Sequence, residues 1–192
     1  MRSENSSYHH ISKLLHWLMA FCILGMIALG YFMEDIRPAS LRIDAYQFHK
    51  SLGITLLALT LLRIVWRLTH RPPALPSTMK PMERLAANIS HIGFYVLMLA
   101  MPLSGWIMVS ASGKYPTIFF WLFNMPHLPM PEGVDLKALR KLAYEIHEIT
   151  TTWLALGLLG VHILAALKHH YIDRDTVLVR MLPRFLAVKL RR

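Results

Sequence analysis

Four histidines of this sequence lie within or at the edges of long apolar stretches, where a side chain that prefers water is costly unless it has a partner. Two of them, His147 and His162, belong to the single stretch IHEITTTWLALGLLGVHILAALKHH at residues 146–170. The other two are His16 and His49. Imidazole nitrogens are common ligands of transition metals and of haem iron. The depth of each ring in its stretch therefore decides what the four histidines can bind together.

The composition is typical of a membrane protein. Of the 192 residues, 55% are hydrophobic and only 17% are charged, and the mean hydropathy is +0.39. The single cysteine, Cys22, excludes an internal disulfide, and because there is no C-x-x-C-H motif, any haem is expected to be held non-covalently. The formal net charge is +10, but the basic residues flank apolar spans, which indicates contact with anionic lipid headgroups and not with nucleic acid.

Four segments reach the roughly 20 apolar residues that a helix needs to cross the hydrocarbon core of a bilayer. They lie at about 14–33, 48–69, 88–110 and 145–168. The first lacks a small-residue cleavage site, so it is predicted to be a retained helix and not a signal peptide. A fifth segment, 115–126, is short and bracketed by prolines, and is predicted to lie at the headgroups. The expected fold class is an all-α membrane protein, a four-transmembrane-helix bundle that forms one membrane domain over 1–192.

The lysines and arginines outside these spans are distributed unequally. Thirteen lie on the side of the two termini and seven on the opposite side, and Arg63, inside the second span, belongs to neither group. By the positive-inside rule, both termini are expected to be cytoplasmic. The basic tail at 171–192 alternates apolar and basic residues, which predicts that it lies on the cytoplasmic surface of the membrane.

With this topology, the four histidines fall into two layers. An α-helix rises about 1.5 Å per residue, so His162 lies about 22 Å closer to the cytoplasm than His147. His49 joins His147 in an outer layer, and His16 joins His162 in an inner layer. Fifteen residues turn a helix by a net angle of about 60°, so both rings of the fourth span can face the bundle interior without being aligned.

Two imidazoles from facing helices suit the two axial positions of a haem iron, whereas zinc normally takes a third or fourth protein ligand. Haem is therefore favoured over zinc or copper in each layer. A lone histidine in a membrane is more often hydrogen-bonded to a neighbouring helix, but two depth-matched pairs favour ligation. His91 competes for the inner layer. Of the remaining histidines, His169 and His170 are expected at the membrane interface. The others are expected in solvated loops: His9, His10, His70 and His127.

Several motifs accompany these histidines in order: HW at 16–17, FHKSLG at 48–53, LLRIVWR at 61–67, HIGFYVLMLAMPLSGW at 91–106, SGK at 112–114, HE at 147–148 and VHILAALKHHYIDRDTVLVRMLPR at 161–184. In this order and spacing, the chain resembles the bacterial cytochrome b561 family, small di-haem cytochromes of the bacterial inner (plasma) membrane, over about 13–184. The resemblance implies that His91 is not a ligand. It implies four axial haem ligands, His16, His49, His147 and His162, in the pairs His16/His162 and His49/His147.

One departure from the family concerns the fourth span. The interval between His147 and His162 is one residue longer in this chain. Either the helix absorbs the extra residue through a local bulge, or the outer ring enters its site at a different angle. The geometry of the outer haem is the property that this departure affects.

The resemblance implies electron transfer across the membrane through two haem b groups, coupled to a quinone. The activity that it favours is that of a haem b oxidoreductase, which oxidises superoxide on the periplasmic side and reduces ubiquinone. One alternative is a cytochrome that oxidises quinol and delivers electrons to a periplasmic partner. Another is a metal or proton transporter that uses the intramembrane histidines, but the spans lack acidic residues in their middles and show no inverted repeat.

Basic residues adjoin the two outer histidines in the sequence and could form a local positive funnel for superoxide. They are Lys50, Lys137, Arg140 and Lys141. The outer loops carry seven acidic residues against seven basic ones, however, so no net field is expected there.

Other basic side chains are better explained by pairing with haem propionates or lipid headgroups than by contact with substrate. Lys13 and Lys50 belong to this group. Arg63 and Arg67, one helical turn apart, are expected to contact haem propionates or the cytoplasmic interface.

Overall fold

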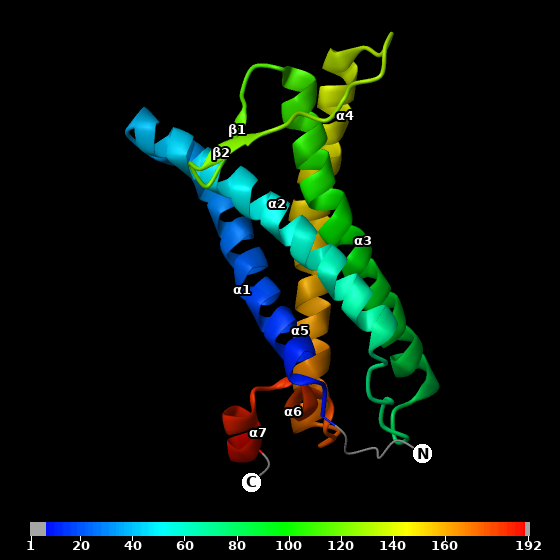
Figure 1. The fold of residues 1–192 in the computed structure, drawn as a ribbon. Coiled ribbons are helices and arrows are strands. Elements are labelled where there is room, and N and C mark those ends of the chain that lie inside the picture. The colour runs from blue at the N-terminus through cyan, green and yellow to red at the C-terminus, as the bar shows by residue number, and fades with distance from the viewer. Residues whose placement is uncertain (1–6, 191–192) are drawn as a thin grey trace.

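The computed structural model describes residues 7–190, apart from the side chains of Arg184, Lys189 and Leu190. Its four long helices are α1 (His10–Phe32), α2 (Ala39–Thr69), α3 (Pro81–Ser112) and a continuous fourth helix over Leu136–Tyr171. A 3-10 turn, Met33–Asp35, extends α1. All four are long and apolar enough to cross a membrane, which confirms the predicted all-α fold with four transmembrane helices (Figure 1).

The fourth helix has three parts. These are α4 (Leu136–Ile149), a π-helical segment (Thr150–Ala155) and α5 (Leu156–Tyr171). The Asp135 side chain caps the start of α4 by accepting hydrogen bonds from the backbone N–H groups of Lys137 and Ala138. We refer to Thr150–Ala155 below as the π segment.

Helix packing follows the chain. Helix α2 lies along α1 and α3, and α3 lies along α4, the π segment and α5. Many large apolar side chains on the outer surface are exposed, such as those of Phe21, Leu68 and Trp153, whereas Ser51, Thr60 and Ser104 are buried. Lipid leaves no hydrophobic force to drive helices together, so small residues at the contacts allow close packing while apolar side chains face the acyl chains.

A β-hairpin between α3 and α4 packs against the N-terminal half of α2 (Figure 1). Its strands are β1 (Thr117–Phe119) and β2 (Phe123–Met125), paired antiparallel with Phe119 opposite Phe123. The buried Ser51 hydroxyl donates to the Ile118 carbonyl at 3.2 Å and accepts from the Phe120 N–H at 2.9 Å. The segment predicted to lie at the headgroups is thus a hairpin fastened to the helix that carries His49. We call this the hairpin end of the bundle, and it is predicted to be periplasmic.

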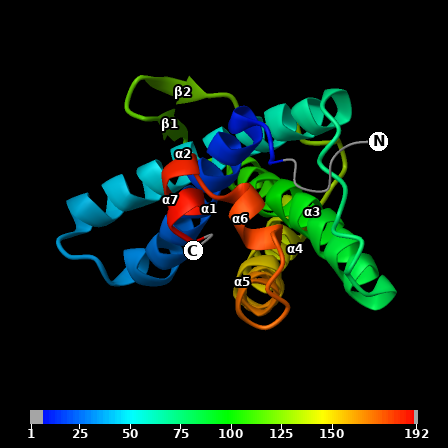
Figure 2. The same ribbon diagram turned by 90° about the horizontal axis from the view of Figure 1, so that it is seen from below.

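Two short helices close the opposite end, which we call the tail end (Figure 2). Helices α6 (Val177–Met181) and α7 (Arg184–Leu190) follow α5. The Trp17 indole donates to the Met181 carbonyl at 3.0 Å and the Lys13 ammonium donates to the Leu182 carbonyl at 2.9 Å. The described part of the tail is therefore packed against the start of α1. Its location on the cytoplasmic side stays a prediction.

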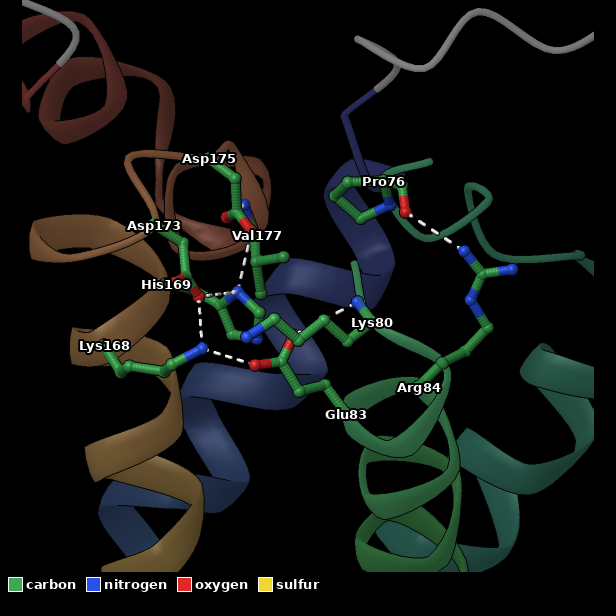
Figure 3. Close-up of polar contacts among 9 residues, drawn as sticks. All are labelled: Pro76, Lys80, Glu83, Arg84, Lys168, His169, Asp173, Asp175 and Val177. Carbon is green, nitrogen blue, oxygen red and sulfur yellow. Dashed lines mark hydrogen bonds and ion pairs between the residues drawn. The ribbon is translucent and has the colours of Figure 1, made fainter. Parts of the chain in front are cut away.

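A cluster of charged side chains ties α3 to α5 at the tail end (Figure 3). The Lys168 ammonium lies 2.5 Å from the Glu83 carboxylate and 2.7 Å from that of Asp173. The His169 Nδ1 atom lies 2.7 Å from Asp175 and 3.1 Å from Asp173. His169 is only 7% exposed, so it is a buried member of this cluster and not the interfacial side chain that we expected.

We expect Asp173→Asn to lower the midpoint of thermal unfolding at neutral pH, because it removes the carboxylate that Lys168 and His169 contact. The hydrogen bond from Lys168 lowers the pKa of the Asp173 carboxyl. Such a carboxyl adds stability above its unfolded-state pKa of about 4, and that stability is lost as the pH falls through the lower folded-state pKa.

Thermal unfolding in detergent, measured from neutral to acidic pH, should therefore show the two proteins converging below about pH 4. The control is Asp44→Asn, which alters a carboxylate in α2, away from this cluster, and should leave the midpoint unchanged. A difference between Asp173→Asn and the unmodified protein that persists undiminished in acid would contradict the linkage.

Candidate haem sites

The two histidines predicted for the outer layer face each other. His49 on α2 and His147 on α4 have ring centres 6.2 Å apart and planes inclined by 66°. An imidazole nitrogen binds a first-row metal ion at about 2 Å and the ring centre lies about 1 Å farther back, so two rings on opposite sides of one ion have centres about 6 Å apart. The observed separation is the one that axial ligation of a single iron requires.

The inner pair repeats this geometry. His16 on α1 and His162 on α5 have ring centres 6.2 Å apart and planes inclined by 59°. The structure thus brings together each of the two predicted pairs, and each pair joins the fourth helix to a different partner helix. Ligation by these four residues stays a prediction.

The π segment lies between the two histidines of the fourth helix. A π turn holds one residue more than an α turn, and single π turns inside α-helices are often found at functional sites. The extra residue between His147 and His162 is therefore absorbed here, by the local bulge that was one of the two expected alternatives. The two rings keep the relative rotation that a spacing one residue shorter has in a continuous α-helix.

The ring of His147 is held by groups from α3. Its Nδ1 lies 2.8 Å from the Met101 carbonyl oxygen and 3.2 Å from the Ser104 hydroxyl. Donation of the Nδ1 proton to the carbonyl leaves the lone pair of Nε2 available for a metal, the arrangement typical of metal-binding histidines. A Cβ atom on Gly105 would lie 3.4 Å from the His147 ring, in van der Waals contact, so the ring packs directly against this part of α3.

His49 also faces a glycine on the neighbouring helix. A Cβ atom on Gly30 of α1 would lie 3.5 Å from the His49 ring. The Nδ1 atom of His49 is buried and has no hydrogen-bond partner among the described residues. Buried polar atoms without partners are rare, and one explanation is a group that binds there. Facing imidazoles, bordering glycines and this unpaired nitrogen together fit a haem between α2 and α4.

The inner pair adjoins a basic recess near the tail end. The Arg63 guanidinium lies 3.4 Å from the Nδ1 atom of His16. Arg63, Arg67 and Arg71 line the recess together with His9 and His70, and among the described residues no aspartate or glutamate does. Such a recess suits an anionic group. His70 is exposed, as expected, and stacks on Trp66 with ring centres 3.6 Å apart.

The basic residues at the hairpin end are already partly engaged. The Lys50 ammonium donates to the Pro116 carbonyl at 2.9 Å and so helps to fasten the hairpin to α2. Lys141 lies 3.7 Å from Glu145 on the exposed face of α4. Neither contact shows whether these side chains also meet a substrate or a haem propionate. For Lys50, contact with a propionate stays a prediction.

Zinc fits these residues less well than haem. In the described part of the chain, the only group of three ligand atoms close enough to share a metal ion comprises Glu83, His169 and Asp173. The Lys168 ammonium is bonded to both carboxylates of this group, so the cation they need is already supplied. None of the four predicted haem ligands belongs to it.

A membrane-spanning bundle whose facing helices present imidazole pairs at this separation has the architecture of a b-type membrane cytochrome. Comparison with known sequences identifies the family. The family model described as Prokaryotic cytochrome b561 matches residues 7–184, and the chain therefore belongs to the prokaryotic cytochrome b561 family. Haem b binding and transmembrane electron transfer follow from this membership, which replaces the alternative of a histidine-based transporter.

Curated relatives match along nearly the whole chain. Cytochrome b561 homolog 2 of Escherichia coli (strain K12) is 35% identical over 176 residues, which are 91% of this chain and 90% of that protein. Cytochrome b561 homolog 1 of the same organism is 32% identical over 177 residues, 88% of this chain and 93% of that protein. The Probable superoxide oxidase CybB of Yersinia pestis is 31% identical over 173 residues, 88% of this chain and 92% of that protein.

We expect Gly30→Leu to displace the His49 ring and to lower the haem content by loss from the outer site, because the new side chain would extend toward the ring from 3.5 Å. The matched control is Gly25→Leu on the same helix, where a Cβ atom meets nothing within 4 Å. Haem per chain is measured by the pyridine haemochrome assay. Equal haem loss in both variants would show that a leucine anywhere on α1 lowers the haem content, and that contact with the His49 ring is not the cause.

Proposed function

We propose that this protein, embedded in the lipid of the bacterial inner membrane with both termini cytoplasmic, transfers electrons from periplasmic superoxide to ubiquinone through two haem b groups. The observation that carries the proposal is the pair of imidazole couples, each with ring centres 6.2 Å apart, at the two ends of one bundle. A bis-histidine haem iron supplies one-electron redox chemistry without needing a catalytic nucleophile.

The side chains around each couple take defined roles in this proposal. His49 and His147 would hold the iron of the outer haem, and the Met101 carbonyl orients the His147 ring. His16 and His162 would hold the iron of the inner haem. The surrounding apolar side chains exclude water, which strengthens every electrostatic interaction inside the bundle.

Basic side chains serve the propionates. Arg63 and Arg67 line the recess beside the inner couple and are suited to pairing with carboxylates there. The contact between Arg63 and His16 is long, at 3.4 Å. The Arg63 side chain can therefore turn away from His16 and toward such a carboxylate. Lys50 is the corresponding residue beside the outer couple, where its ammonium also holds the hairpin.

The proposed reaction transfers two electrons, one from each of two superoxide anions, to one ubiquinone. Two superoxide anions each give up one electron and leave as dioxygen, and one ubiquinone takes up both electrons and two protons to form ubiquinol. The charged anion crosses the bilayer poorly, so the outer couple is its point of entry. The similarity to the Probable superoxide oxidase CybB of Yersinia pestis supports this donor.

A second candidate reverses the flow, from quinol through the haems to a periplasmic redox partner. The engagement of Lys50 by the Pro116 carbonyl and of Lys141 by Glu145 favours this alternative, because both contacts weaken an anion funnel. The balance of charges in the outer loops has the same effect. The substrate experiment below separates the two directions.

We expect two low-spin b-type haems per chain. His162→Ala should remove the inner haem and keep the outer one, while His49→Ala should do the reverse, because each iron loses one of its two protein ligands. Pyridine haemochrome assays give the haem content, and redox titration with visible spectra shows which haem remains. A well-folded unmodified protein with one haem or none would refute the two-haem proposal.

We also expect glutamine substitutions of Lys50, Arg140 and Lys141 to slow haem reduction by superoxide, by about tenfold at low salt, and to flatten its dependence on ionic strength. Reduction by a quinol should change much less, because a quinol reaches the protein from the membrane. Stopped-flow spectroscopy measures both rates, with Arg42→Gln as a control for the general loss of an outer positive charge.

If superoxide reduces the unmodified protein slowly, and neither salt nor these substitutions alter the rate, superoxide is not the donor. The quinol-oxidising carrier would then be the better account.

A further inference from the structure

The inner layer contains a third imidazole that the proposed function leaves unused. His91 on α3 has its ring centre 6.3 Å from that of His162, with planes inclined by 67°. The corresponding values for His16 and His162 are 6.2 Å and 59°. His162 therefore has two neighbouring imidazoles, on two different helices, at the separation that axial ligation of one iron requires.

Helix packing holds His91 in this place. Helix α3 packs against α5. A Cβ atom on Gly93, two residues after His91, would lie only 3.2 Å from the Leu158 side chain of α5, so the two helices are closely packed at this level. The distance between His91 and His162 is thus set by two packed helices.

The hydrogen bonds of the two candidate partners differ. The Arg63 guanidinium, which can only donate, lies 3.4 Å from the Nδ1 atom of His16. A histidine that binds a metal through Nε2 carries its proton on Nδ1, as His147 does toward Met101, so His16 must release Arg63 before it can bind in this way. Among the described residues, no hydrogen bond holds the ring of His91, which needs no such release.

We propose that His91 is an alternative axial ligand of the inner haem, which shares His162 with His16 and takes the place of His16 when that ring is absent. The inference rests on the proposed function, because it presupposes a haem at the inner couple. It assigns His162 as the one inner ligand that cannot be replaced. His16 and His91 are then each dispensable, and only the loss of both removes the second axial ligand.

The test uses the full chain with four variants: His16→Ala, His91→Ala, the double variant His16→Ala/His91→Ala and His162→Ala. Haem per chain is measured by the pyridine haemochrome assay and spin state by electron paramagnetic resonance, neither of which depends on activity. Both single variants at His16 and His91 should keep two low-spin haems. The double variant should lose the inner haem or convert it to a five-coordinate, high-spin form, and His162→Ala should lose it.

The inference is overturned if His16→Ala alone has one haem, or one low-spin and one high-spin haem, while the outer haem remains intact. The outer haem serves as an internal control for folding, and His16→Gln is a second variant in case the alanine substitution prevents assembly. The inference is also overturned if the low-spin signal of His16→Ala is identical to that of the double variant. If the unmodified protein lacks a bis-histidine inner haem, the proposed function fails instead, which the same assays reveal.

Discussion

The arrangement of the bundle depends on one distance, the 6.2 Å between imidazole centres that recurs in two couples, each of which joins two different helices. Lipid provides no hydrophobic force to hold helices at such a spacing. Small side chains and backbone groups do so instead. At the outer couple, the two rings pack against α1 at Gly30 and α3 at Gly105, and the Met101 carbonyl holds His147.

The fourth helix connects the two couples mechanically because it carries one histidine of each. The π segment sets the rotation of His147 relative to His162, and the two ends of the helix are held separately. Asp135 caps the hairpin end, and the contacts of Lys168 with Glu83 and Asp173 bind the tail end to α3. A change in either anchor would therefore act on both histidine couples through the shared helix.

Hydropathy and helical rise predicted the four spans and the two histidine layers, because both depend on local sequence and on the thickness of the bilayer. The contacts of His147 with Met101 and of His49 with Gly30 were not predicted. A backbone carbonyl has no sequence signature, and a glycine shows its role only when the ring that faces it is known. The burial of His169 also escaped prediction, since it depends on Asp175 after the helix turns back. The residue spacing left a bulge and a different ring angle as alternatives, and it gave no position for the π segment found at Thr150–Ala155.

The distribution of charge bears on the direction of electron flow. Reduction of an iron removes positive charge from its site, so nearby cations favour the reduced state. Arg63 and Arg67 lie beside the inner couple in a recess that no described carboxylate lines, and haem propionates paired with them would oppose reduction less. At the outer couple, Lys50 keeps its positive charge while its ammonium donates to the Pro116 carbonyl, and it is the single cation proposed to pair with a propionate there. In the proposed function, two guanidinium groups at the inner couple against one ammonium at the outer couple would make the inner haem the better electron acceptor, and electron flow from the hairpin end toward the tail end would follow.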